Sequence, residues 1–304
     1  MQPSKTTVIG LFNAPFQYQI PIFQRGYVWT LEKQVAPLWS DIQSQADALL
    51  ERQQLTSGAT TAMKPLPKHF LGSIVMTPVP NAFGRVPMYE VIDGQQRCTT
   101  LHLLLLAMHH AAKDSGQTSV AQMAAAVVRN PGPYLVDAND QHKVWPTQAG
   151  RQEMQGINAA TSVAQICTAY PARDGRNRID RPLMVQTFLY LYHACLAYMQ
   201  GVDLSDPVAH PGGADPDRSH SDVLVASIRN ANAVVPVPAA GKANALRAQA
   251  LYMALADQVQ LMTLSLDVDD DPQVIFETLN ARGEPLLASD LVRNFLDRKS
   301  TRLN

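Results

Sequence analysis

Apolar and polar positions along residues 70–112 follow two different periods in succession. Residues 70–79 and 88–92 are short apolar runs rich in β-branched side chains, and residues 81–87 between them contain Asn, Gly and Pro. We therefore expect two strands joined as a hairpin. A leucine-rich run of helical type follows at residues 101–112, which predicts that the second strand leads through a tight turn into a helix.

Similar patterns predict further elements in the rest of the chain. Residues 31–50 carry apolar side chains close to helical spacing. Thr30 is a candidate N-cap, but Lys33 stands where an acid would complete a capping box. We expect helices at 120–129, 149–155, 183–200, 245–257 and 272–280, and a last helix from about 289. We also expect a polar linker at 51–68, a flexible loop at 203–220 and a strand at 259–268.

The most informative polar residues lie where the second predicted strand meets its helix. They are Asp93, Gly94, Gln95, Gln96 and Arg97. A helix N-terminus exposes free N–H groups and a partial positive charge, which favour a bound anion, and an arginine adds a planar charge suited to phosphate. The alternative is structural, with Asp93 as the helix cap and Gly94 as the turn. That alternative leaves the Gln-Gln-Arg sequence unexplained.

Composition narrows the class of protein. The 304 residues suffice for one large domain or two small ones, and 46% hydrophobic residues argue against disorder. The net charge of −1 means that no overall field attracts nucleic acid, so any such contact is local. Cys98, Cys167 and Cys195 form no CxxC pair. With no visible signal peptide or membrane-spanning run, we expect a soluble cytoplasmic protein without a disulfide frame.

Two charged clusters have simple interpretations. Arg173, Arg176, Arg178 and Arg181 lie close together, and two aspartates offset part of their charge. We expect a solvated loop there, with a contact to nucleic-acid phosphates as the alternative. The aspartates at 269–271 precede a predicted helix, so compensation of its dipole is favoured over metal binding.

Three segments together resemble one protein family. They are residues 20–29 (IPIFQRGYVW), residues 70–106 (FLGSIVM followed by VIDGQQRCTTLHLLLL) and residues 276–294 (FETLNARGEPLLASDLVRN). In this order they are similar to the N-terminal domain of GmrSD-type modification-dependent restriction proteins, and to the N-terminal domains of SspE and BrxU.

The resemblance implies an α+β fold, with a ParB/sulfiredoxin-like core and a large, mainly helical addition. We accordingly expect a nucleotide-binding core at residues 1–112, a mainly helical insertion with flexible loops at 113–245, and a strand and helices that return to the core at 246–304.

The resemblance also implies nucleotide chemistry, because in this family the DGQQR box is tied to hydrolysis of nucleoside triphosphates (NTPs). Arg97 would stabilise charge on the transferred phosphoryl group, a glutamine would orient water, and Asp93 would hold Mg²⁺ or accept a proton. The expected catalytic residues are Asp93, Gln95, Gln96 and Arg97, and the expected nucleotide-binding residues are Gln24, Arg25, Gly94, Thr99 and Thr100.

Two further groups of residues are weaker candidates. Phe23, Tyr27 and Trp29 could line a pocket for a modified base or DNA backbone, with core packing as the alternative. A second part of the site could comprise Asn280, Arg282, Asp290 and Asn294. Their alternative role is structural, since Asn280 can end one helix and Asp290 can cap the next.

The implied function is an NTP-binding and hydrolysing sensor domain of an anti-phage restriction system that regulates a nuclease. NTP is the expected substrate, and Mg²⁺ the expected cofactor. Expected partners are modified DNA, an HNH-type nuclease domain in cis or trans, and a second copy of the chain. Because the chain ends soon after the third segment, we expect no nuclease activity from it alone. The alternative is a non-catalytic module that binds modified DNA or a partner. A nuclease inside the ParB-like core ranks last, because the sequence has no cluster of acids and histidines with metal-ligand spacing outside the acidic turn.

Overall fold

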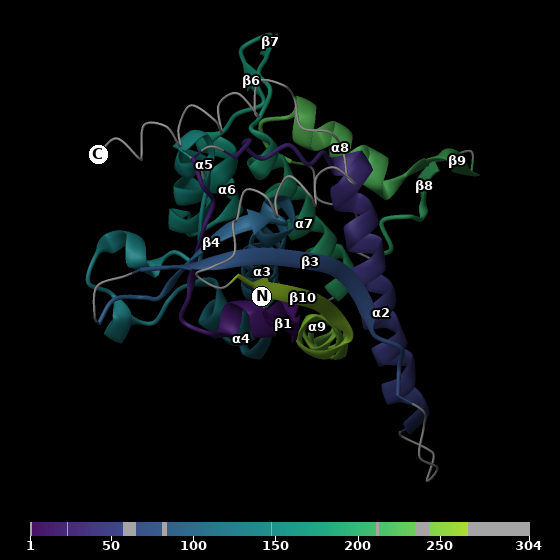
Figure 1. Ribbon diagram of the computed structural model, residues 1–304. Coiled ribbons are helices and arrows are strands. Elements are labelled where there is room, and N and C mark those ends of the chain that lie inside the picture. Colours follow the sequence, from purple (N-terminus) through teal and green to yellow (C-terminus); the bar gives the residue numbers. More distant parts are fainter. Residues whose placement is uncertain are drawn as a thin grey trace.

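A mixed β-sheet organises the molecule, which is seen here in a computed structural model (Figure 1). The structure describes residues 2–22, 24–56, 65–80, 84–146, 148–210, 213–234 and 243–266. Within these ranges six strands pair in the order β1-β10-β3-β4-β2-β5. Their bounds are β1 Gln2–Thr7, β2 Gln17–Gln19, β3 His69–Val79, β4 Met88–Asp93, β5 Val144–Trp145 and β10 Val259–Ser265.

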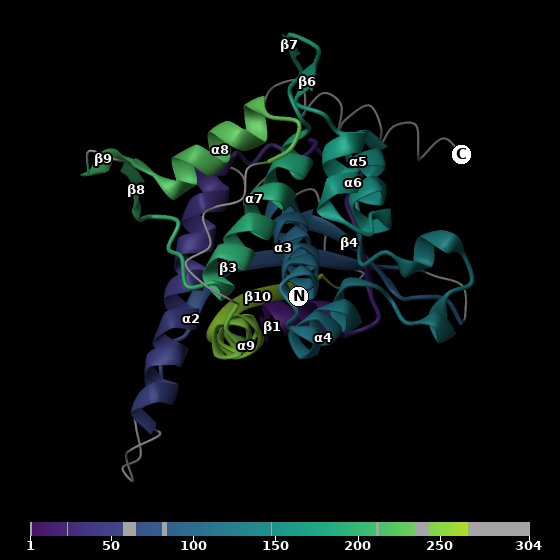
Figure 2. The same cartoon turned by 180° about the vertical axis from the view of Figure 1, so that it is seen from behind.

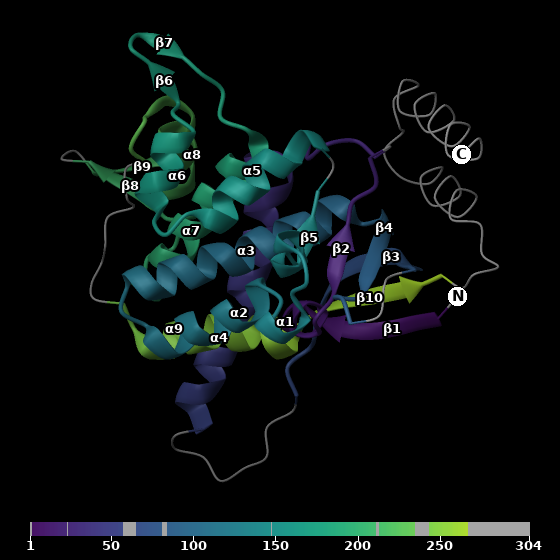
Figure 3. The same ribbon diagram turned by 90° about the vertical axis from the view of Figure 1, so that its left-hand side faces the viewer.

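Helices cover one face of this sheet (Figure 3). They are α1 Val8–Asn13, α2 Ala36–Thr56, α3 Gln95–Asp114, α4 Thr118–Val128, α5 Gln148–Ala159, α6 Val163–Ala169, α7 Leu183–Met199, α8 His220–Asn230 and α9 Ala245–Met253. Two π turns, η1 (Leu31–Val35) and η4 (Ala254–Gln258), adjoin α2 and α9, and two short 3-10 turns are η2 (Gly132–Tyr134) and η3 (Ala138–Gln141). None of the helices in the described ranges is long and apolar enough to cross a membrane.

Helices α3 and α7 pack side by side at the centre of the helical layer (Figure 2). Both are buried over almost their whole length, including the run Leu103–Leu106. A helix that is apolar all round is expected where neighbours surround it on every side. The leucine-rich run after the DGQQR box is therefore the centre of the core, and it holds the N-terminus of α3 in a fixed place.

The strand pairing confirms the α+β expectation. β3 and β4 form the predicted antiparallel hairpin, with a register shift between Val75 and Met76. β2 runs parallel to both β4 and β5, while β10 lies between β1 and β3. Strand β5 comes from residues 113–245, so that range contributes to the sheet as well as to the helical layer.

Two predictions about loops are wrong. The loop expected at 203–220 contains an antiparallel hairpin of β8 (Pro207–His210) and β9 (Gly213–Ser219), and its last residue begins α8. The linker expected from residue 51 is wrong for residues 51–56, because α2 continues to Thr56. Glu51 and Gln53 are exposed on that extension. Glu, Arg and Gln have good helix propensity, so a polar sequence can continue a helix that reaches into solvent.

The basic cluster separates into two environments. Arg173, Arg176 and Arg178 are exposed on the hairpin of β6 (Arg173–Asp174) and β7 (Asn177–Arg178), which projects from the molecule (Figure 1). Arg181, by contrast, is 3% exposed. Its guanidinium donates to the carbonyls of Tyr170, Ile228, Ala231 and Asn232. The expectation of a solvated loop is therefore wrong for Arg181. Its hydrogen bonds instead link the segment before α7 to the end of α8.

Candidate functional site

The DGQQR box forms the predicted strand, turn and helix. β4 ends at Asp93, Gly94 is the N-cap of α3, and the helix begins at Gln95. Gly94 has φ +85°, in the left-handed region, and a Cβ there would lie 2.8 Å from the Ser73 carbonyl oxygen. Only glycine meets both conditions without strain. The close approach that requires glycine is thus to the backbone of β3.

The structure does not bear out Asp93 as the helix cap. The N-cap is Gly94, and no side chain accepts a hydrogen bond from the first turn. The first helical bond is from the Cys98 N–H to the Gly94 carbonyl. Within the described residues, the backbone N–H groups of Gln95, Gln96 and Arg97 have no acceptor. The N-terminus of α3 is therefore open to an anion.

A cavity of about 640 Å³ lies in front of this helix N-terminus. That volume is within the range of roughly 300–1,000 Å³ usual for small-molecule sites. The lining residues are Gln24, Arg25, Val28, Trp29, Thr30, Lys33, Gln34, Ile92, Asp93, Gly94, Gln95, Gln96 and Arg97. Three of them are cations and one is a carboxylate, so the wall carries an excess of positive charge.

The three cations differ in how they are held. Arg97 donates from Nη1 to the Ser73 carbonyl at 2.7 Å and lies over Gly72, where a Cβ would be 3.0 Å from Nη2. Burial lowers the pKa of Arg97, the nearby Asp93 carboxylate opposes this shift, and arginine stays charged in proteins. Arg25 and Lys33 make no hydrogen bond or ion pair with the described residues. One cation is thus pre-oriented, and two remain available to a ligand.

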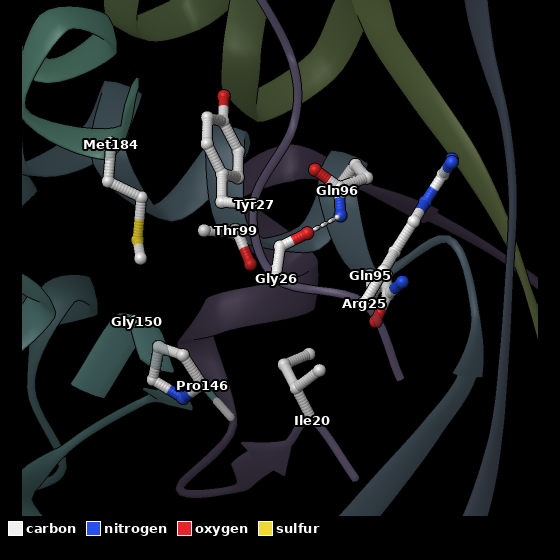
Figure 4. A pocket seen from close by; sticks show the side chains of 10 residues that line it. All are labelled: Ile20, Arg25, Gly26, Tyr27, Gln95, Gln96, Thr99, Pro146, Gly150 and Met184. Carbon is white, nitrogen blue, oxygen red and sulfur yellow. Dashed lines mark hydrogen bonds between the residues drawn. The ribbon is translucent and has the colours of Figure 1, made fainter. Parts of the chain in front are cut away.

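Gln24 and Gln96 brace the segment that forms one wall of the cavity. The Gln24 amide donates to the carbonyls of Val91 and Ile92 at 2.9 and 2.8 Å. The Gln96 amide donates to the Gly26 carbonyl at 3.0 Å (Figure 4). The Gln96 side-chain oxygen accepts from the Val28 N–H at 2.8 Å. These bonds tie residues 24–28 to β4 and α3, and they occupy both ends of the Gln96 side chain.

Gln95 is placed differently from Gln96. Its Oε1 atom is buried and has no hydrogen-bond partner. Its side chain lines the large cavity and also a second cavity of about 20 Å³. A buried amide oxygen without a partner costs about 1–3 kcal/mol, so a ligand or water that supplies a donor is stabilised there. Gln95 is therefore the glutamine of the box whose side-chain oxygen is free to accept a hydrogen bond from a ligand.

The aromatic candidates do not gather into one pocket. Trp29 lines the large cavity, and Tyr27 lines the small one. The Tyr27 hydroxyl bonds to Thr100 at 2.7 Å and to Thr187 at 3.2 Å, and burial raises its pKa to about 12. Thr100 is fully buried and lines neither cavity, whereas Thr99 lines the small one. Tyr27 and Thr100 thus join the wall segment to α3 and α7.

Several candidates lie outside the described residues. They are Phe23, Asn280, Arg282, Asp290 and Asn294, together with the aspartates at 269–271. Within the described residues no group of three or more His, Cys, Asp or Glu could hold a metal by itself. Among the described residues that line the large cavity, Asp93 is the one carboxylate. A single carboxylate fits Mg²⁺ held jointly by the protein and substrate phosphates, which is how that ion is usually bound.

Sequence reasoning missed Lys33 and Gln34 as cavity residues. The Thr30 N–H donates to Gln34 Oε1 at 3.0 Å, one position later than in a standard capping box. The displacement arises because η1 is a π turn, in which the Val35 N–H reaches the Thr30 carbonyl. Lys33 is consequently not needed at the cap and lines the cavity. The sequence signal that could have identified Gln34 is a glutamine four residues after the N-cap.

Comparison with known proteins identifies the family. The profile of the GmrSD restriction endonuclease N-terminal domain matches residues 8–296. No curated protein matches the chain. The matched range contains every residue that lines the large cavity in front of the DGQQR box. The chain therefore belongs to the family of GmrSD restriction endonuclease N-terminal domains.

Proposed function

We propose that this chain binds and hydrolyses an NTP in the large cavity, and that nucleotide turnover regulates a nuclease. Family membership makes the chain a component of a restriction system. The observation that carries the proposal is the open N-terminus of α3, which faces a cavity lined by Arg25, Lys33 and Arg97. Free N–H groups and unpaired cations on one cavity wall suit a polyphosphate better than any neutral ligand.

The cavity suggests how the nucleotide is oriented. The phosphates lie at the first turn of α3, where Arg97 is held by β3 and can stabilise charge on the terminal phosphoryl group. Val28 and Trp29 offer apolar surface to the base. Asp93 is placed to hold Mg²⁺ with the phosphates, and the ion would neutralise charge on the phosphate oxygens.

The two glutamines of the box have separate roles in this proposal. Gln96 holds the wall segment in position through its bonds to Gly26 and Val28. Gln95 has a free amide oxygen and can contact the reacting groups. Replacing Gln96 is expected to weaken nucleotide binding, and replacing Gln95 to slow turnover.

Phosphate release tests the proposal. The four NTPs are compared with and without Mg²⁺, and with and without duplexes of modified DNA. Arg97→Ala should reduce turnover about 100-fold or more, as expected for loss of a charge that stabilises a phosphoryl-transfer transition state. Arg176→Ala, an exposed arginine on the β6–β7 hairpin, is the matched control and should retain turnover without DNA. Full activity in a folded Arg97→Ala protein would refute the proposal.

A second candidate function is a non-catalytic module that binds modified DNA or a partner. The projecting β6–β7 hairpin favours it, because Arg173, Arg176 and Arg178 are exposed there and could contact backbone phosphates. Both candidate functions involve modified DNA and a regulated nuclease, in cis or trans. Gel shifts of modified and plain duplexes, with and without nucleotide, separate the two candidates. DNA binding that does not change when nucleotide is added supports the second candidate.

A further inference from the structure

The 20 Å³ cavity lies directly behind the DGQQR box. Figure 4 shows Gln95 and Arg25 together on one side of it, with Met184 and Pro146 on the opposite side. A cavity needs roughly 10–15 Å³ to admit one water molecule, so this one accommodates a single water. Arg25, Gln95 and Gln96 line both cavities, which therefore adjoin each other at these side chains.

The small cavity has the polar groups that a water requires. Gln95 Oε1 is buried without a partner. The Thr99 side chain lines the cavity, and its hydroxyl makes no hydrogen bond within the described part of the chain. The Tyr27 hydroxyl points away from the cavity and is engaged by Thr100 and Thr187. Gln95 and Thr99 thus supply two partners, the minimum for an ordered water.

We propose that this cavity holds the water that attacks the terminal phosphate, and that Gln95 and Thr99 orient it. The inference rests on the proposed NTP hydrolysis and assigns the nucleophile a place in it. The water oxygen forms a bond to the terminal phosphorus while the bond from that phosphorus to the bridging oxygen breaks. One water proton passes to an oxygen of the departing phosphate, and the other stays on the attacking oxygen, so the products are the nucleoside diphosphate and inorganic phosphate.

The far wall of this compartment comes from the helical layer. Gly150 of α5 and Met184 at the start of α7 line it, and a Cβ on Gly150 would collide with the Met184 methyl group. Gly150→Ala would therefore displace Met184, whose flexible end would move into the space for the water. This substitution alters the compartment without changing any polar group of the box.

Steady-state kinetics of three variants test the inference. Thr99→Val removes the hydroxyl at nearly constant shape, and Gly150→Ala reduces the space. Both should lower kcat about tenfold or more, the effect of losing one hydrogen bond of about 1.4 kcal/mol in the transition state. Affinity for a non-hydrolysable NTP analogue should change less than about threefold, because binding does not involve the water. Thr99→Ser keeps the hydroxyl and should restore kcat.

Gly156→Ala is the matched control. Gly156 lies in the same helix α5, and a Cβ there would also meet a side chain, that of Tyr170, but neither residue is among those that line the small cavity. It should retain the wild-type kcat. Unchanged kcat in folded Thr99→Val and Gly150→Ala would overturn the water site while leaving NTP hydrolysis intact. Absence of hydrolysis by the wild-type protein would instead refute the proposed function itself.

Discussion

At the residue scale, neighbouring identical side chains have different roles. Gln95 and Gln96 are adjacent in sequence, yet Gln96 is hydrogen-bonded at both its amide nitrogen and its oxygen to the backbone of Gly26 and Val28, and Gln95 Oε1 has no partner. The sequence predicts a polar box at a helix start, but it does not separate these two residues. Their difference depends on where residues 24–28 pass, which is a tertiary fact that no local pattern contains.

Gly94→Ala tests the turn at this scale. The substitution places a Cβ in the left-handed region and 2.8 Å from the Ser73 carbonyl oxygen. The backbone conformation alone costs roughly 1–2 kcal/mol, and the collision with β3 adds to it. We expect a loss of at least about 2 kcal/mol in the free energy of unfolding, measured with urea. Gly84→Ala is the control, because Gly84 also has positive φ but has open space around it. Equal losses in both variants would mean that the contact with β3 is unimportant.

At the scale of elements, an ion pair joins the helical layer to the cavity wall. Arg229 of α8 contacts Glu32 of η1 through both terminal nitrogens of its guanidinium, Nη1 at 2.5 Å and Nη2 at 2.9 Å, and its hydrogen bond lowers the pKa of Glu32. Lys33, the next residue in η1, lines the large cavity. The pair therefore helps to set the position of a cation that faces the cavity.

Breaking this pair should weaken nucleotide binding modestly. Both side chains are partly exposed, so the interaction is worth at most about 1 kcal/mol, or about fivefold in affinity. Arg229→Glu should raise the Kd of an NTP analogue by up to that factor, and the double variant Glu32→Arg/Arg229→Glu should recover most of it. Failure of the double variant to recover would show that charge pairing is not the cause.

Elements with a strong local pattern were predictable, and those defined by pairing were not. The predictions for β3, β4, α3, α7 and most of α4 are confirmed, because their apolar residues recur over many positions. β1, β2 and β5 were missed, since none of them carries an apolar run like that of β4. They form by pairing with strands distant in sequence, β1 with β10 and β2 with β4 and β5. The cavity could not be predicted either, because η1, β4 and α3 meet only in the fold.

At the scale of the whole molecule, buried histidines make stability depend on pH. Burial lowers the pKa of His102, His110 and His193 from 6.5 to about 4. Between these values the unfolded chain binds more protons than the folded one, so stability is lost as the pH falls from 6.5 towards 4. Each histidine contributes a slope of up to about 1.4 kcal/mol per pH unit.

Urea unfolding at pH 7, 6 and 5 measures this slope. His193 is the informative residue, because both of its ring nitrogens are buried without a partner. His193→Phe removes this buried titrating group, so the stability of the variant should fall less steeply between pH 6 and pH 5 than that of the wild-type protein. An identical slope in both proteins would show that His193 is not protonated on unfolding in this range.

The position of β10 in the sheet has a consequence for synthesis of the chain. β1 is made long before β10, yet among the described strands β1 pairs with β10 alone, and β10 separates it from β3. While the ribosome has not yet released residue 265, both β1 and β3 therefore present open edges that invite pairing with other chains. The nascent protein is thus exposed to aggregation until β10 has been made and has paired, and a chaperone that shields strand edges would act on it during that interval.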